Sequence, residues 1–279
     1  SIQFALTDET KLNQFTEIFD KLAVANDYVN IISTSEHGIY IQRMNSTTSY
    51  IFETRLQPSW FTEYHCKNLQ GDDNINIVIN TGIINKILKM RKPDQPLLAV
   101  WNNSSSDKLS FTFEAGNKTL FTTEFACPLF DVIIDTLEIP VNTVHCVDIL
   151  ISADILRQQV SNLKFFDNNI QITCDDDGLR LSSKGDNGSM KVSINPEDLE
   201  EFALIPTDKP LVFNYNAEHF LEICSLKTMG EQVYLHLSNS IPMKIEYRLD
   251  PSTETTEDSD EEEEEESDTV DNTLTKTYA

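Results

Sequence analysis

The apolar positions of the chain follow a helical period in some segments and a strand period in others. After Thr7 they recur at helical spacing, with Asp8 and Glu9 in the opening turn, where the helix dipole favours acids. This spacing predicts a first helix that buries Leu12, Phe15, Ile18, Phe19 and Leu22. A second helix is predicted over about 82–90, capped by Thr81, with an inner face formed by Ile83, Ile84, Ile87 and Leu88.

Short alternating segments predict the strands, and the order of elements in the first half recurs in the second. The first-half strands are expected at 38–44, 49–56, 64–69, 74–80, 96–102, 108–114 and 118–127. In the second half, helices over 152–165 and 217–226 are expected among strands at 144–151, 170–174, 179–183, 190–195, 210–215, 233–237 and 243–249. The second pair of helices begins about 140 residues after the first, which indicates a duplication.

These patterns predict an α+β fold of two similar domains, each with two helices packed on antiparallel sheets. We assign residues 1–130 to the N-terminal domain, 131–146 to a connecting loop, 147–251 to the C-terminal domain and 252–279 to an acidic tail. The tail contains six consecutive glutamates, which predict disorder through self-repulsion. Residues 272–279 alternate weakly, so an additional edge strand there stays open.

The charge of the chain is strongly negative, which argues against an ordinary DNA-binding domain. The formal net charge is −25, and residues 251–279 contribute −11 of it through twelve acids and one lysine. A nucleic-acid role therefore requires the basic residues to concentrate on one surface. No apolar run reaches membrane-spanning length, so no membrane partner is expected. Five scattered cysteines without a CxxC pair indicate reduced intracellular thiols.

No catalytic, metal or cofactor motif stands out in the sequence. The five histidines are isolated and lack the spacing of metal ligands, and no phosphate-binding loop occurs. Asp175–Asp177 resembles the carboxylate set of a two-metal nuclease, but it precedes Gly178, and aspartate is common in turns. We therefore expect a turn there and keep a nuclease as an alternative.

The basic residues gather on and beside the predicted helices. They are Lys86, Lys89, Arg91, Lys92, Arg157, Lys164 and Lys227. Taken alone, each group could be a solvated helix face. If the duplication brings these helices to one side, however, they form a positive stripe that attracts phosphates without reading bases.

Five stretches carry a family resemblance, and they occur in register. They are IYIQRMNSTTSYIFETRL at 39–56, NKILKM at 85–90, LEIP at 137–140, GDNGSMKVSI at 185–194 and IPMKIEYRLD at 241–250. Together they resemble the PCNA family of eukaryotic-type DNA sliding clamps over about residues 2–250. Asn13, Gln14 and Asp20 stand where the family usually has lysines, which indicates a divergent member, with a viral source as one option.

The resemblance implies the DNA clamp fold in a closed homotrimeric ring, with helices lining the hole and sheets outside. The seven basic residues would then face or approach double-stranded DNA and hold it independently of sequence. A strand near 118–126 would pair with one near 188–194 of the next subunit. The family's C-terminal Leu-Ala-Pro-Lys segment does not directly follow Asp250.

The resemblance also implies a partner-peptide pocket under the connecting loop. Its residues would be Met44, Ile51, Leu137, Ile139 and Pro242, and its partners a DNA polymerase, a flap nuclease, a ligase and a clamp loader. Taken alone, these apolar residues are equally typical of an ordinary core.

The expected function is a non-enzymatic processivity factor without a cofactor or metal. It would act in DNA replication and repair, in the nucleus or at a cytoplasmic replication site of a virus. Two alternatives stay open: a monomeric or heterotrimeric clamp-like subunit, and a metal-dependent nuclease using Asp175–Asp177.

Overall fold

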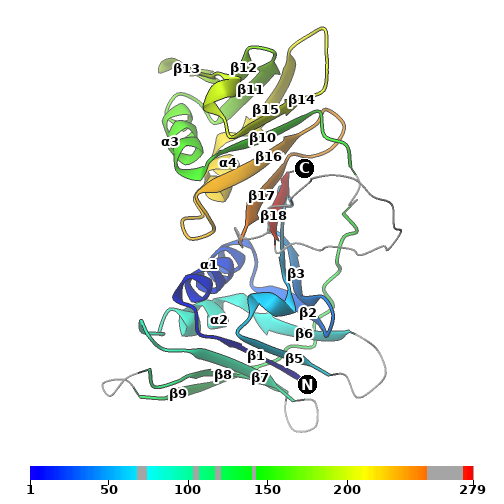
Figure 1. The fold of residues 1–279 in the computed structure, drawn as a ribbon, viewed down its shortest axis with the longest axis vertical. Coiled ribbons are helices and arrows are strands. Elements are labelled where there is room, and N and C mark those ends of the chain that lie inside the picture. The colour runs from blue at the N-terminus through cyan, green and yellow to red at the C-terminus, as the bar shows by residue number, and fades with distance from the viewer. Residues whose placement is uncertain (68–73, 103–106, 117–120, 140–142, 250–272, 279) are drawn as a thin grey trace, which may run out of the picture. The chain divides into compact units, whose positions relative to one another are not determined.

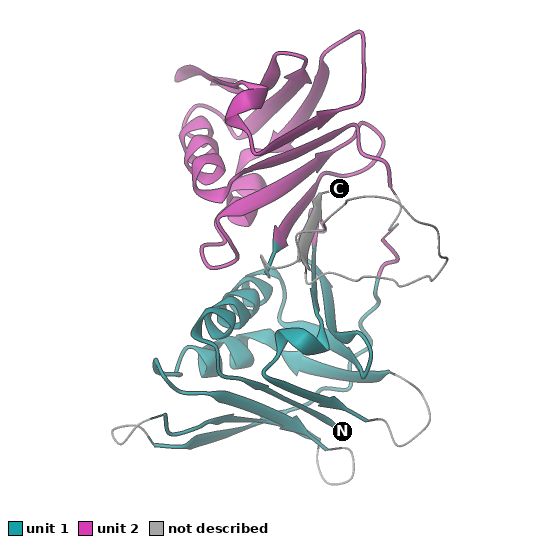
Figure 2. Cartoon of the chain, viewed as in Figure 1, with its two compact units in different colours: residues 1–45, 52–136, 248–274 teal, residues 46–51, 137–247, 275–279 magenta. Residues whose placement is uncertain are grey.

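The computed structural model describes residues 1–67, 74–102, 107–116, 121–139, 143–249 and 273–278. The chain divides into two compact units, shown in Figure 2. Unit 1 comprises residues 1–45, 52–136 and 248–274, and unit 2 comprises residues 46–51, 137–247 and 275–279. No helix in the described part of the chain is long and apolar enough to cross a membrane.

Unit 1 packs two helices against antiparallel strands (Figure 1). The helices are α1 (Glu9–Ala25) and α2 (Thr81–Leu88), and a 3-10 turn, η1, covers Pro58–Trp60. One sheet has the order β5-β1-β7-β8-β9, formed by Glu63–Cys66, Ile2–Leu6, Leu97–Trp101, Lys108–Phe113 and Thr123–Pro128. A second run, β4-β3-β2-β6, is formed by Tyr50–Leu56, Gly38–Met44, Tyr28–Thr34 and Ile75–Asn80.

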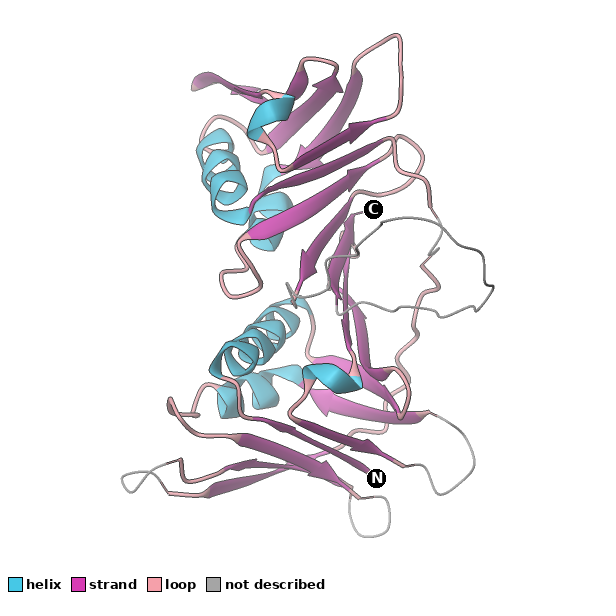
Figure 3. Cartoon of the chain, in the orientation of Figure 1, coloured by secondary structure: helices cyan, strands magenta, loops and turns pink. Residues whose placement is uncertain are grey.

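Unit 2 has the same composition of elements (Figure 3). Its helices are α3 (Ala153–Lys164) and α4 (Ala217–Cys224), and a second 3-10 turn, η2, covers Pro196–Asp198. One sheet has the order β13-β12-β11-β15, formed by Gly188–Ile194, Gly178–Gly185, Asn169–Asp175 and Leu211–Asn216. A second run, β14-β10-β16-β17-β18, is formed by Glu201–Leu204, Val147–Ser152, Gln232–Leu237, Lys244–Arg248 and Thr273–Tyr278.

The order of strands shows the duplication more clearly than the sequence does. The run β5-β1-β7-β8-β9 of the first half has its counterpart in β14-β10-β16-β17-β18 of the second. In this correspondence β18 is the equivalent of β9, although residues 250–272 stand between β17 and β18 in the sequence. The strand alternative for the C-terminal residues therefore holds for Thr273–Tyr278, while the acidic residues of the predicted tail lie outside the described part.

The predicted apolar faces of the helices form the core. All five predicted residues of α1 are at most 2% exposed, and Phe15 packs edge-on against Phe4 of β1. Asp8 caps the helix, because its side chain accepts a hydrogen bond from the Lys11 backbone N–H at 2.9 Å. Burial at this level provides most of the stability of such a helix, since isolated helices of this length are marginal in water.

The second helix differs from the prediction at two positions. Its cap is Asn80, whose side-chain oxygen accepts from the Ile83 backbone N–H at 2.9 Å. Thr81 is instead buried and donates its hydroxyl to the Asn26 carbonyl at 2.5 Å. Ile83 is 39% exposed, so the inner face of α2 consists of Ile84, Ile87 and Leu88 without it.

Three strands were not predicted: β1, β2 and β14. The strand expected at 118–127 begins later, at Thr123, and residues 117–120 lie outside the described part. The strand expected at 64–69 corresponds to β5, which ends at Cys66.

Candidate nucleic-acid interface

Four of the candidate DNA-binding residues follow one another on and just after α2. Residues 81–92 contain four cations and no acid. Lys86 and Lys92 are exposed, and neither ammonium group has an acidic partner within the described residues. These two side chains are therefore available to a phosphate.

Lys89 has a partner on the neighbouring helix. Its ammonium group forms an ion pair with Asp20 of α1, and Asp20 also accepts a hydrogen bond from the Asn85 amide at 3.2 Å. Burial alone would raise the pKa of Asp20, but the hydrogen bonds from Lys89 and Asn85 outweigh it, so the pKa lies below its usual value. Asp20 stays charged at neutral pH and offsets the charge of Lys89.

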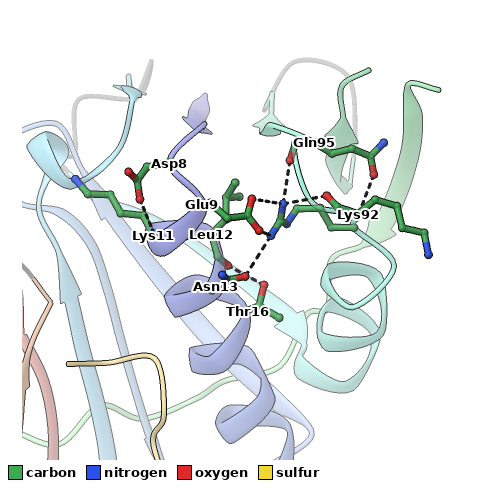
Figure 4. Close-up of polar contacts among 9 residues, drawn as sticks. Asp8, Glu9, Lys11, Leu12, Asn13, Thr16, Lys92 and Gln95 are labelled. Carbon is green, nitrogen blue, oxygen red and sulfur yellow. Dashed lines mark hydrogen bonds and ion pairs between the residues drawn. The ribbon is translucent and has the colours of Figure 1, made fainter. Parts of the chain in front are cut away.

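Arg91 is held inside unit 1 by a set of hydrogen bonds. Its two terminal nitrogens donate to the two carboxylate oxygens of Glu9 at 2.7 and 3.0 Å. Further bonds go to the Asn13 side chain and to the carbonyls of Lys92 and Gln95. Figure 4 shows these four partners arranged around the one guanidinium group.

The burial of Arg91 argues against a direct contact with DNA. Its side chain is only 7% exposed. The hydrogen bonds from Arg91 are the largest cause of the lowered pKa of Glu9, so the pair is ionised at neutral pH. We read Arg91 as a residue that fixes α1 to the segment after α2, and we leave it out of the proposed DNA-facing set.

The basic residues of unit 2 are also close to acids. Arg157 lies one helical turn from Asp154 on α3 and bonds to it at 2.8 Å. The Lys164 ammonium is 3.7 Å from a carboxylate oxygen of Glu218 on α4. Lys227, just beyond α4, is exposed. α4 itself carries two acids and no cation, so α3 and α4 together contain three acids and two cations.

Sequence reasoning missed the acids that accompany these cations. Glu9 and Asp20 are separated from Arg91 and Lys89 by 82 and 69 residues. No local period connects them, and only the packing of α1 against α2 brings them together. The absence of the usual family lysines from the first helix was the available signal, since Asp20 occupies one of those positions.

The candidate pocket residues lie at the surface or near it. Met44 ends β3, Ile51 lies on β4, and both are half-buried. Leu137 is 47% exposed, Ile139 is half-buried, and Pro242 is exposed. The connecting loop also exposes Ile133, at 92%. These side chains are therefore surface residues rather than ordinary core, and Pro140 lies outside the described part.

Asp175–Asp177 forms the turn that was expected there. Asp175 ends β11, Gly178 begins β12 with φ +114°, and the two are directly opposite in the register. The Asp175 side chain accepts from the Asp177 backbone N–H at 3.1 Å and forms an ion pair with Arg180. Within the described residues, this stretch is not part of a group that could hold a metal. The Asp175 carboxylate thus stabilises a hairpin.

Among the outermost strands of the described sheets, β9 of unit 1 and β13 of unit 2 each have an uncovered edge. β9 is the last strand of its sheet in unit 1, and β13 is the first strand of its sheet in unit 2. No residue of β13 is buried, and only Cys127 is buried in β9. Both strands have backbone donors and acceptors that no strand of the described chain occupies on the outer side, and such edges favour pairing with another chain.

Comparison with known proteins identifies the family of the chain. The N-terminal domain of proliferating cell nuclear antigen matches residues 9–136, and its C-terminal domain matches residues 138–256. Together these two matches account for most of the chain.

Relatives come from cellular organisms and from a virus. Proliferating cell nuclear antigen of Chaetomium thermophilum is 23% identical over 223 residues, which cover 78% of this chain and 83% of the relative. Proliferating cell nuclear antigen 1 of Plasmodium falciparum is 24% identical over 252 residues, covering 86% and 88%. A probable DNA polymerase sliding clamp of Autographa californica nuclear polyhedrosis virus is 21% identical over 211 residues, covering 75% and 78%.

The family consists of non-enzymatic sliding clamps that act as processivity factors in DNA replication. Its two-domain fold, with four helices and antiparallel sheets, agrees with the elements described above. The chain therefore belongs to the proliferating cell nuclear antigen family and has the DNA clamp fold.

Proposed function

We propose that the chain forms a closed homotrimeric ring around duplex DNA and tethers a DNA polymerase to it. The observation that carries this proposal is the pair of uncovered edges, β9 in unit 1 and β13 in unit 2. When the open edge of β9 in one subunit pairs with the open edge of β13 in the next, the contact is head-to-tail. Three such contacts close into a ring when the rotation between neighbouring subunits is one third of a turn.

The ring holds DNA topologically, so its inner surface needs only weak contacts. Lys86 and Lys92 supply unpaired positive charge, while Lys89, Arg157 and Lys164 lie close to acids that weaken their pull on phosphates. Lys227 adds an exposed cation near α4. Weak, sequence-independent contacts of this kind allow sliding, because each is broken at little cost.

The partner site of the proposed ring is the surface around the connecting loop. The exposure of Leu137 and Pro242, with Ile139, Ile51 and Met44 half-buried, supports a site for an apolar peptide anchor. The partners are a polymerase, a flap nuclease, a ligase and a clamp loader, and the place of action is the nucleus or a viral replication site. The viral relative named as a sliding clamp of DNA polymerase supports the polymerase as the first partner to test.

The ring is tested by one substitution at the edge of β9. Leu129 and Asp107 extend the β8–β9 register, and the Leu129 N–H donates to the Asp107 carbonyl at 2.8 Å. In an antiparallel pair the hydrogen-bonded positions alternate. The N–H groups of the odd-numbered β9 residues therefore point toward β8, whereas the N–H of Glu124 points to the open edge. Pro128 occupies another outward position and has no N–H to donate.

Glu124→Pro removes an outward donor without removing a bond to β8. Light scattering of the unchanged chain should give about 95 kDa, three times 31.8 kDa, and the variant should give a monomer with an unchanged circular dichroism spectrum. Glu124→Ala, which keeps the N–H, should remain trimeric. A monomer for the unchanged chain at all concentrations would overturn the ring and favour an open or heterotrimeric clamp.

A further inference from the structure

Three potential metal ligands from separate parts of unit 2 lie close together. His145 lies near the end of the connecting loop, Asp148 lies on β10, and His236 lies on β16. One ligand atom of each lies within 4.8 Å of those of the other two. All three side chains are half-buried, and they are the one such group among the described residues.

The register of the sheet explains why these residues meet. Asp148 is directly opposite His236, and His236 is directly opposite Lys244 of β17. The neighbours of Asp148 and His236 along their strands are buried, so by alternation both side chains point to the other face of the sheet. The two imidazole rings of His145 and His236 lie 5.0 Å apart between centroids.

The second nitrogen of His236 has no hydrogen-bond partner among the described residues. Nδ1 is 2.6 Å from the Asp148 carboxylate, whereas Nε2 is buried and unsatisfied. The nearest acid to Nε2 is Glu246, whose carboxylate oxygen is 3.9 Å away and is paired with Lys244 at 2.5 Å. A buried imidazole nitrogen without a partner is costly unless something binds it.

We propose that His145, Asp148 and His236 form a binding site for a divalent transition metal ion of the Zn²⁺ class. Three protein ligands leave a fourth position for water or for a group of a partner. Two imidazoles and one carboxylate suit Zn²⁺ and disfavour Mg²⁺, which prefers oxygen ligands and keeps its waters.

The geometry of the three side chains agrees with this proposal. Tetrahedral Zn²⁺ with bonds of about 2.0–2.2 Å places its ligand atoms roughly 3.4 Å apart, so small side-chain rotations bring this group into position. Asp148 either binds the ion directly or orients His236 through Nδ1, as carboxylates commonly do for metal-binding histidines.

The consequence of metal binding would be local order at the end of the connecting loop. His145 is the last loop residue but one before β10, whereas Asp148 and His236 belong to strands. An ion held by all three therefore attaches the loop end to the sheet. This does not depend on the ring or on DNA.

The site is tested by titrating the full chain with ZnCl₂ in isothermal calorimetry. Millimolar Mg²⁺ in the buffer competes for the carboxylates of the acidic residues 252–271, which reduces the response of sites that have oxygen ligands only. We expect one Zn²⁺ per chain, at least tenfold weaker binding in His145→Ala and in His236→Gln, and weaker binding as the pH falls, because protons compete for the imidazoles. Co²⁺ should give the intense visible absorption of a four-coordinate ion.

His37→Ala is the matched control, because His37 is also beside a carboxylate, that of Glu36 at 3.8 Å, but has no second imidazole near it. This variant should bind Zn²⁺ as the unchanged chain does. His145→Ala changes a loop residue and should leave the sheet folded, which circular dichroism checks. Equal Zn²⁺ binding in the unchanged chain and in both His145→Ala and His236→Gln would overturn the proposal, as would the absence of binding with Mg²⁺ present.

Discussion

At the scale of single residues, Arg91 shows how a cation that the sequence predicts to approach DNA can serve the fold instead. A guanidinium group offers five donors in a rigid plane, and here they meet both oxygens of Glu9, the Asn13 side chain and two carbonyls. An ammonium group could reach only part of this set. The identity of the residue therefore matters beyond its charge.

We predict that Arg91→Lys destabilises the chain by about 2 kcal/mol, because charge-assisted hydrogen bonds are lost while polar partners stay in place. Urea unfolding followed by circular dichroism measures this change. Lys92→Ala, at the neighbouring exposed position, should change the free energy of unfolding by less than about 0.5 kcal/mol. Equal effects of the two variants would show that the hydrogen bonds of Arg91 contribute little.

The pH dependence of stability gives a second readout of the same pair. The folded-state pKa of Glu9 is lowered from 4.5, first by its hydrogen bonds to Arg91. The stabilisation is therefore present above pH 4.5 and is lost as the pH falls through the lowered pKa. This acid-dependent loss should be smaller in Arg91→Lys than in the unchanged chain.

At the scale of elements, the helices α1 and α2 combine opposite charges on one surface. Asp20 of α1 neutralises Lys89, whereas Lys86 of α2 has no acidic partner within the described residues. We therefore expect the affinity of the proposed ring for DNA to depend on the balance of charge between the two helices rather than on the lysines alone.

We predict opposite effects for two substitutions on this surface. Lys86→Glu should weaken DNA association and lower the slope of log affinity against log salt by about one, whereas Asp20→Asn should release Lys89 and raise the slope by about one. Both slopes are measured by fluorescence anisotropy of the clamp after it has been loaded onto circular duplex DNA, over a range of salt concentrations.

Two exposed residues that belong to neither α1 nor α2 provide controls for these effects. Lys209→Glu and Asp27→Asn make the same charge changes on an exposed loop of unit 2 and just after α1. Both should leave the slopes nearly unchanged. If Lys209→Glu weakens binding as strongly as Lys86→Glu, net charge rather than a basic helix surface governs the association.

The sequence predicts those elements whose stability depends on a local period. The helical period of α1 identified five of its seven buried residues and missed Gln14 and Ala25, and the clean alternation of β6 predicted that one of its faces is buried. Strand β14 is only four residues long and has no buried residue, so its pairing with β10, about fifty residues earlier, defines it. The pairs of Lys89 with Asp20 and of Arg91 with Glu9 depend in the same way on contacts between distant segments, which no local pattern contains.

At the scale of the whole molecule, the acidic residues and the last strand need to be considered separately. All twelve acids of residues 251–279 precede β18 in the sequence. β18 itself is the neighbour of β17 in the strand order, as β9 is of β8. If the whole segment were treated as an acidic tail, the strand β18 would be counted as part of that tail rather than as part of the sheet.

We predict that two deletions separate these roles. A chain ending at residue 272 lacks β18 and leaves β17 without this neighbour, which removes backbone hydrogen bonds and opens a sheet edge. A loss of about 2 kcal/mol lowers the unfolding temperature of a chain of this size by roughly 4–8 °C.

Replacement of residues 252–271 by a short Gly-Ser linker keeps β18 and removes the acids. The unfolding temperature of this variant should equal or exceed that of the full chain, because self-repulsion is reduced. Thermal unfolding followed by circular dichroism compares all three proteins. If the chain ending at residue 272 is as stable as the full chain, β18 contributes nothing to the fold, and the correspondence of β18 with β9 loses its energetic meaning.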